Sequence, residues 1–136
     1  MNRERGSASL ELVLLTPVLL GLFLFVVMGG RYAQARADVG SAARDAARAA
    51  SIARSPAAAR DAAEEAARRR LGDRGVVCGD LVMTLDVSDF RPGGTVSAAV
   101  SCTVDLSDLT GLGIPASATF EEDFSEPVDQ FRGVDQ

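Results

Sequence analysis

Histidine, lysine and tryptophan are absent from this 136-residue chain, and only two cysteines, Cys78 and Cys102, are present. Without histidine, no Ser-His-Asp or Cys-His catalytic arrangement can form, and His-containing zinc sites are excluded. Two cysteines are too few for a four-thiolate metal site within one chain. A carboxylate-only active site stays formally open, but nothing supplies a partner for such a pair. The sequence therefore predicts a protein that is not an enzyme, with no cofactor and no metal.

The charge is divided unevenly along the chain. Residues 1–74 contain 12 Arg and 8 acidic residues, whereas residues 75–136 contain 2 Arg and 11 acidic residues. The acidic half would repel phosphate groups, so nucleic acid is not an expected partner. The glycines at 72, 75 and 79 lack the strand–loop–helix context of a nucleotide motif, and no small-molecule substrate is expected. The acidic surface is interpreted as the solvated face of one modest domain.

A long apolar run lies near the N-terminus. Residues 12–28 contain no charge, and with their small neighbours they give about 20 residues, enough to span a bilayer. Pro17 is tolerated in a membrane-spanning helix. An ordinary signal peptide is the alternative, but Arg31 and Tyr32 occupy positions where a cleavage site needs small residues. The sequence predicts a transmembrane helix over residues 7–30.

Helical character continues beyond the apolar run. Residues 31–54 are rich in alanine and contain no proline, which predicts one continuous helix from about Ser7 to about Arg54. Its larger apolar residues form only a weak stripe. The members of that stripe are Tyr32, Val39, Ala46 and Ile52.

A second helix is predicted after this point, so that residues 31–72 hold two Ala/Arg-rich helices. Ser55 followed by Pro56 is a helix-start signal, and Gly72 is interpreted as the stop after Leu71. Two Glu→Arg pairs at i,i+4 spacing support the helix. They are Glu64 with Arg68 and Glu65 with Arg69, and the Arg68–Arg70 cluster suits the negative end of the helix dipole.

From Val76 onward the apolar period changes to two. Alternating runs over residues 81–88 and 95–106 flank a Pro92-Gly93 turn signal, which predicts a hairpin. A weaker third run covers residues 114–124. The fold class is therefore α+β, with a small three-stranded antiparallel sheet over residues 73–125, a tail over 126–136, and the Ala-rich helix as the cover that the sheet needs.

The most informative pattern stands at the start of the apolar run, where Gly6-Ser7 precede Glu11 behind a short leader containing Arg3 and Arg5. A carboxylate at the start of a spanning segment costs roughly 2–3 kcal/mol if it lies deep. Glu11 is therefore either close enough to the interface to stay wet or paired with a partner in the membrane.

This segment resembles a type IV prepilin leader, and more closely the N-terminus of the TadE-like minor pilins of tight-adherence (Flp-type) pili. The resemblance implies a leader over residues 1–6, cleavage after Gly6 by a prepilin peptidase, Ser7 as the new N-terminus, and Glu11 as an assembly residue that neutralises the Ser7 amine of a neighbour. The Ala-rich continuation and the segment at residues 127–132 are also similar to this family. The expected partners are the membrane, the peptidase and other pilins.

The resemblance implies a structural role, as a minor pilin or pseudopilin of a surface fibre. Arginine counts around the apolar run slightly favour the C-side inside, but a short leader usually stays inside. We therefore expect a single-pass protein with a cytoplasmic N-terminus and an extracytoplasmic C-terminal part. Two alternatives remain open: a membrane-anchored extracytoplasmic binding module, and a secreted protein, such as a small hydrolase, that begins beyond Ala35.

Cys78 and Cys102 are expected to form a disulfide if residues 76–136 lie outside. The alternative is two unpaired small apolar side chains, since free cysteine packs well in cores. A hairpin turning at Pro92-Gly93 places Met83 opposite Cys102, with Cys78 about 17 Å too far along. The bond would therefore require the chain to fold back before the strand, at Gly79-Asp80.

Overall fold

The computed structural model describes residues 5–107 and 115–131, with side chains from residue 11 onward. The described elements are α1 (Arg5–Ser51), α2 (Pro56–Asp73), β1 (Cys78–Asp86), β2 (Thr95–Asp105) and β3 (Ser117–Pro127). The predicted α+β class is confirmed. Residues 1–4 of the predicted leader and 132–136 of the predicted tail lie outside the described residues. The chain divides into two compact units, residues 1–33 and 34–136, which are treated separately.

Helix α1 is continuous across the predicted membrane segment and the Ala-rich segment. It ends at Ser51 rather than near Arg54, because the hydroxyl of Ser51 donates to the carbonyl of Arg48 at 2.9 Å. The amide of Ala53 closes the following turn on the carbonyl of Ala50 at 3.1 Å. A serine hydroxyl that bonds backbone in this way competes with helix continuation.

Helix α2 begins as predicted and ends later than predicted. The Ser55 hydroxyl accepts from the amide of Ala58 at 3.2 Å, and Pro56 occupies the first turn. Gly72 lies inside the helix, and the left-handed residue that ends it is Gly75, with φ +67°. The amide of Val76 bonds the carbonyl of Leu71 at 2.9 Å, and that of Gly75 bonds Gly72 at 3.0 Å. This is a Schellman motif, so the stop signal is Gly75 rather than Gly72.

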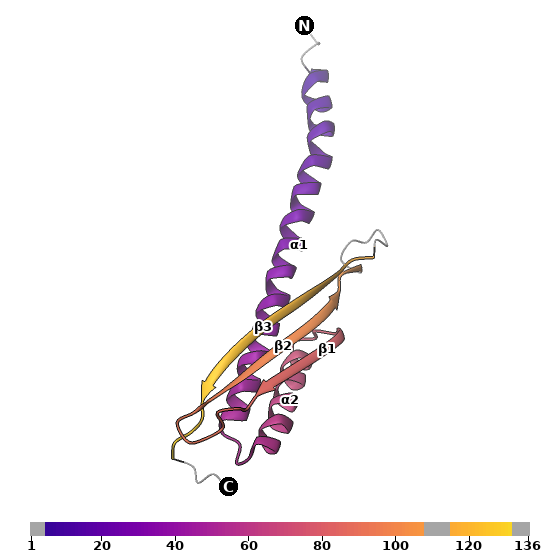
Figure 1. Ribbon diagram of the computed structural model, residues 1–136. Helices are drawn as coiled ribbons and strands as arrows, with labels where there is room; N and C mark the ends of the chain where they lie inside the picture. The colour runs from indigo at the N-terminus through magenta and orange to yellow at the C-terminus, as the bar shows by residue number, and fades with distance from the viewer. Residues whose placement is uncertain (1–4, 108–114, 132–136) are drawn as a thin grey trace. The chain divides into compact units, whose positions relative to one another are not determined.

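The three strands form one antiparallel sheet in the order β1-β2-β3 (Figure 1). The Pro-Gly turn is present: Gly93 has φ +77°, and the amide of Gly94 bonds the carbonyl of Arg91 at 2.7 Å. The register differs from the expected one by two residues, because Leu81 and not Met83 lies opposite Cys102. An additional turn, in which the amide of Phe90 bonds the carbonyl of Val87 at 3.2 Å, lengthens the connection on the β1 side.

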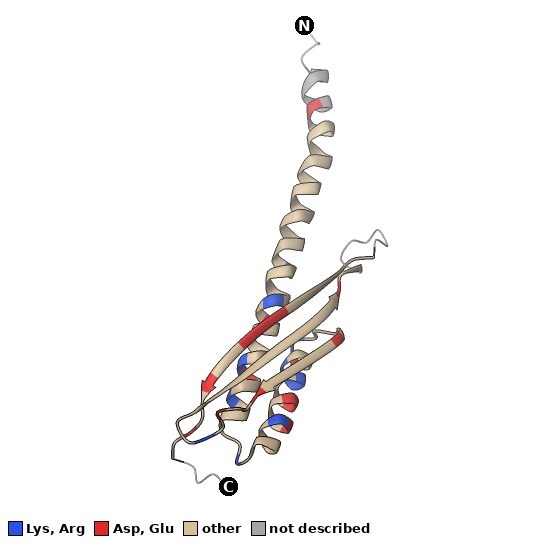
Figure 2. Ribbon diagram, viewed as in Figure 1, with Lys and Arg blue, Asp and Glu red and all other residues tan. Residues whose placement is uncertain are grey.

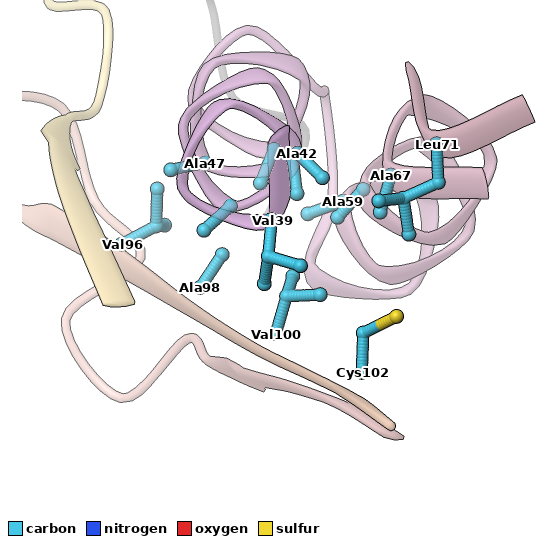
Figure 3. Packing of buried hydrophobic residues seen from close by; sticks show 14 of the residues in the cluster. Val39, Ala42, Ala47, Ala59, Ala67, Leu71, Val96, Ala98, Val100 and Cys102 are labelled. Carbon is cyan, nitrogen blue, oxygen red and sulfur yellow. The ribbon is translucent and has the colours of Figure 1, made fainter. Parts of the chain in front are cut away.

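Within the unit of residues 34–136, α2 and the C-terminal part of α1 cover one face of the sheet (Figure 1). The core between these layers is built mainly from alanines and valines (Figure 3). The helices contribute Val39, Ala42, Ala43, Ala46, Ala47, Ala50, Ala59, Ala63, Ala67 and Leu71, and the strands and the segment after β3 contribute Val96, Ala98, Val100, Cys102, Phe120 and Val128.

The Ala-rich helix is thus the cover predicted for the sheet. The expected stripe is only partly right. Val39 and Ala46 are buried, but Tyr32 and Ile52 are 51% and 47% exposed. Alanines i, i+3 and i+4 apart form the contact surface instead.

The predicted tail begins too early. Strand β3 extends to Pro127, and Val128 is buried with 3% of its surface exposed. The amide of Val128 bonds the carbonyl of Gly94 at 2.8 Å, and the amide of Gly93 bonds the carbonyl of Val128 at 3.1 Å. The residues after β3 are therefore held against the turn that precedes β2.

We predict opposite effects for alanine at two glycines of this unit. A Cβ on Gly94 would overlap the carbonyl oxygen of Asp89, so Gly94→Ala should destabilise the unit by about 1–3 kcal/mol. The control Gly72→Ala meets no atom within 4 Å and lies in a helix, so it should stabilise by up to about 1 kcal/mol. Hydrogen exchange of the β2 amides in the full chain measures the change in stability for each variant. Equal protection in the two variants would contradict the packing at Gly94.

Candidate functional site

The first unit contains a helix segment that is apolar on every side. The large apolar residues from Leu12 to Met28 are 39–74% exposed, and none of the residues that the structure describes covers them. Figure 2 shows no charged residue on α1 between Glu11 and the first arginine that follows the run. A helix that is apolar all round, without a protein partner, is typical of a membrane span. In the described part of the chain, α1 is long and apolar enough to cross a membrane.

Two residues inside this segment would disturb a helix in water. The Thr16 hydroxyl donates to the carbonyl of Leu12 at 2.7 Å, which satisfies its donor within its own helix. Pro17 has no N–H, so the helical hydrogen bond to the carbonyl of Val13 cannot form, yet α1 continues through it. Both features are compatible with a helix that spans lipid, where polar groups must be satisfied internally.

The predicted processing and assembly residues lie at the start of α1. The backbone of Gly6 and Ser7 belongs to the first turns of the helix, and Glu11 follows as an exposed residue before the apolar run. Ser7 and Glu11 are four residues apart on a helix, which places them one turn apart on the same side, about 6 Å along the axis. The Glu11 carboxylate has no hydrogen bond or ion pair with any side chain from residue 11 onward that the structure describes.

Residues 6–48 match the family model described as TadE-like protein. The match begins at Gly6, includes Glu11 and the apolar run, and ends within the Ala-rich part of α1. The predicted resemblance is confirmed over this range, which is less than half of the chain. The family is associated with the Tad pilus and is non-enzymatic in general. The comparisons with curated proteins and with solved structures give no match.

The chemistry of the second unit, which lies mostly beyond the TadE-like segment, centres on a disulfide. Cys78 and Cys102 are bonded, with Cα atoms 5.3 Å apart. The expected fold-back of the chain at Gly79-Asp80 does not occur. Instead, the pairing shifts between Cys78 and Asp80, which is a β-bulge at Gly79.

The bulge explains how the two sulfurs meet. Without it, strict alternation would point Cys78 to the side of Asp80 and Val82, away from the helices. The extra residue reverses the alternation, so Cys78 shares a face with Leu81 and with the buried Cys102. A Cβ at Gly79 would lie 3.6 Å from the carbonyl oxygen of Thr103, which is an ordinary contact, so this contact alone does not require glycine.

Helix α1 also holds β3 through charged groups that the sequence reading did not pair. Arg36 Nε lies 2.6 Å from a carboxylate oxygen of Glu122, and the guanidinium of Arg44 lies 5.1 Å from the centre of the Phe124 ring. Glu122 is 86 residues from Arg36 along the chain, and Phe124 is 80 residues from Arg44. No local spacing rule reveals such pairs, although the two arginines lie eight residues apart and so approximately on one helix face.

One buried carboxylate ties the end of α2 to α1. Asp38 is 6% exposed; Gln34 donates to both of its oxygens at 3.2 Å, and Arg74 Nε lies 3.6 Å away. The i,i+4 spacing of Gln34 and Asp38 was the available sequence signal. The predicted pairs of Arg68 with Glu64 and Arg69 with Glu65 are present at 2.8 and 3.1 Å, and Arg70 crosses to Asp45 at 3.6 Å.

Two aspartates that end strands are held in the charged form. Backbone amides donate to their carboxylates, from Ser88 to Asp86 at 2.9 Å and from Ser107 to Asp105 at 2.8 Å. These hydrogen bonds, with a second contribution from the serine hydroxyls, lower the pKa of both aspartates. Among the described residues, no group of three or more Cys, Asp and Glu side chains is placed to hold a metal ion.

We predict that the disulfide is a main source of stability in this unit. It links residues 24 positions apart, so replacing both Cys78 and Cys102 by alanine should lower the free energy of unfolding by about 3 kcal/mol. Hydrogen exchange of β1 and β2 amides gives the change, and the reduced wild-type chain should match the double variant. Alkylation of the native protein without reductant should modify no thiol. Equal protection before and after reduction would show that the bond adds no stability.

Proposed function

We propose that this protein is a membrane-embedded minor pilin or pseudopilin of a tight-adherence type IV pilus, matured by a prepilin peptidase that cuts between Gly6 and Ser7. The observation that carries the proposal is the position of Glu11. It stands at the boundary of an exposed, uncharged apolar helix, five residues after Gly6, within the range that matches the TadE-like family.

The energetics of Glu11 favour a role in assembly. A carboxylate drawn into the apolar layer without a partner is disfavoured by roughly 2–3 kcal/mol on insertion scales. Cleavage after Gly6 would create a positive α-amine on Ser7 at the same membrane border. A neighbouring subunit's amine would then neutralise Glu11, and neither charge would remain unpaired in lipid.

A topology with a cytoplasmic N-terminus and an extracytoplasmic second unit fits this role. The predicted leader is short, and a first span usually inserts with its short leader on the cytoplasmic side. The disulfide between Cys78 and Cys102 supports an oxidising location for the unit of residues 34–136. In this arrangement the leader would end at residue 6 and the span at residue 30, and α2, which ends at Asp73, and the sheet would lie outside.

The first test concerns processing. We expect the mature chain to begin at Ser7 and Gly6→Val to block the cut, because a branched side chain replaces the small residue at the scissile bond. Since the chain has no lysine, an amine-reactive reagent labels only the N-terminal amine, and mass spectrometry then reads the mature start directly.

Gly21→Val is the matched control for this test. It makes the same change inside the apolar run, where no atom lies within 4 Å of the added Cβ, and should be processed normally. An intact Met1 in wild-type protein from cells with an active prepilin peptidase would contradict the proposal. It would favour a membrane-anchored binding module instead.

The second test concerns assembly. Glu11→Ala should leave the protein in the membrane, and removal of a lone carboxylate should ease insertion. The same change should abolish co-purification with other pilins, while Glu11→Asp, which keeps the charge, should retain part of it. Normal association and normal piliation in the Glu11→Ala strain would reduce Glu11 to an interfacial acid.

A further inference from the structure

The sheet of the second unit has one face that the helices leave uncovered. We call it the outer sheet face; it consists of the residues of β1, β2 and β3 that alternate with the core residues. Its acidic members are exposed: Asp80, Asp86, Asp105, Glu121 and Asp123. No arginine of the described strands points to this face. The side chains between the acids are short and uncharged, such as Ala99 and Ser101, so the face is negatively charged.

The two helices carry a surface of the complementary kind. A groove of about 350 Å³ lies between α1 and α2, and its lining includes Arg48, Arg69 and Arg70. Ile52, 47% exposed, adds an apolar patch to the groove, and Asp45 and Asp73 complete its polar rim. The groove therefore combines a net positive charge with exposed apolar surface.

Part of this positive charge is not used within the chain. Arg48 makes no ion pair or hydrogen bond with the residues that the structure describes. Arg70, by contrast, is ion-paired with Asp45, although the distance of 3.6 Å is too long for a hydrogen bond to its buried Nε. A carboxylate brought into the groove from outside would supply an acceptor to Arg48.

The groove and the outer sheet face cannot meet within one copy. The groove residues alternate with the alanines that α1 and α2 turn toward β2, so the groove opens away from the sheet. Figure 2 shows the arginines mainly on the helices, and acidic residues both on the strands and on α2. When two complementary surfaces lie on different sides of one unit, neighbouring copies make a head-to-tail contact. Such a contact builds an open filament if the rotation between successive copies does not close a ring.

We propose that the outer sheet face of one copy docks on the groove between α1 and α2 of a second copy. The occupant is a second copy because the chain itself carries the positive surface that matches its acidic face. This inference deepens the proposed function by naming a lateral contact between subunits, and it uses residues other than Gly6, Ser7 and Glu11. Rim charges mainly set orientation and association rate, so the contact depends on the high local concentration that a shared membrane provides.

Photo-cross-linking of the full chain tests the contact. A photoreactive amino acid at Val82, which is 53% exposed on the outer sheet face, should yield a dimer in membranes. Mass spectrometry should map the cross-link to residues 45–73 of the other copy. High salt should reduce the yield of the cross-linked dimer, because the Debye length falls from about 10 Å at 0.1 M salt to about 3 Å at 1 M.

Charge reversal sharpens the test. Glu121→Arg with Asp123→Arg should lower the dimer yield about tenfold, and so should Arg48→Glu with Arg69→Glu. The four changes combined should restore most of it, which also shows that the variants fold. The control Glu126→Arg makes the same reversal on β3 but on the side shared with Val96, and should leave the yield unchanged.

The outcomes separate this inference from the proposed function. A chain with Glu11→Ala, or one that is never cut after Gly6, should still give the Val82 cross-link, because neither residue belongs to the contact. Failure of processing with a persistent cross-link would overturn the proposed function alone. Absence of a wild-type dimer, a cross-link outside residues 45–73, or failure of the combined reversals to restore the dimer would overturn the docking contact.

Discussion

A single helix must satisfy two different surroundings. Over residues 12–28 α1 is apolar around its whole circumference, whereas over residues 34–51 only one side is buried and the other carries charge. The first pattern is stable only where water is excluded, and the second only where an apolar layer covers one side. Every other element of the chain, α2 and the three strands, follows from the need to provide that layer.

The layer is made from small side chains, which sets the character of the second unit. Alanine contributes little buried area per residue, because each methyl group removes only a small apolar surface from water. Because burial of alanine contributes little free energy, the stability of this unit depends more on its helix caps, on the buried Asp38 and on the Cys78–Cys102 bond.

Local rules predicted the elements well and their mutual positions less well. The Ser55-Pro56 start, the Pro-Gly turn and the apolar alternation of the strands depend on neighbouring residues, and all three are present. The register was wrong by two residues because the turn at Val87–Phe90 has no strong sequence signal. The bulge at Gly79 was read as a bend, since glycine permits both. Contacts such as Arg36 with Glu122 join distant segments, and no single sequence reveals them.

The disulfide has a mechanical consequence for any fibre built from this chain. When a chain is pulled from its two ends, the force passes through the covalent bond between Cys78 and Cys102 and bypasses the residues between them. Those 24 positions of separation correspond to about 80 Å of extended chain that tension cannot release. The hairpin of β1 and β2 is therefore shielded from load, and elongation under force is limited to the helices and to the segments after Cys102.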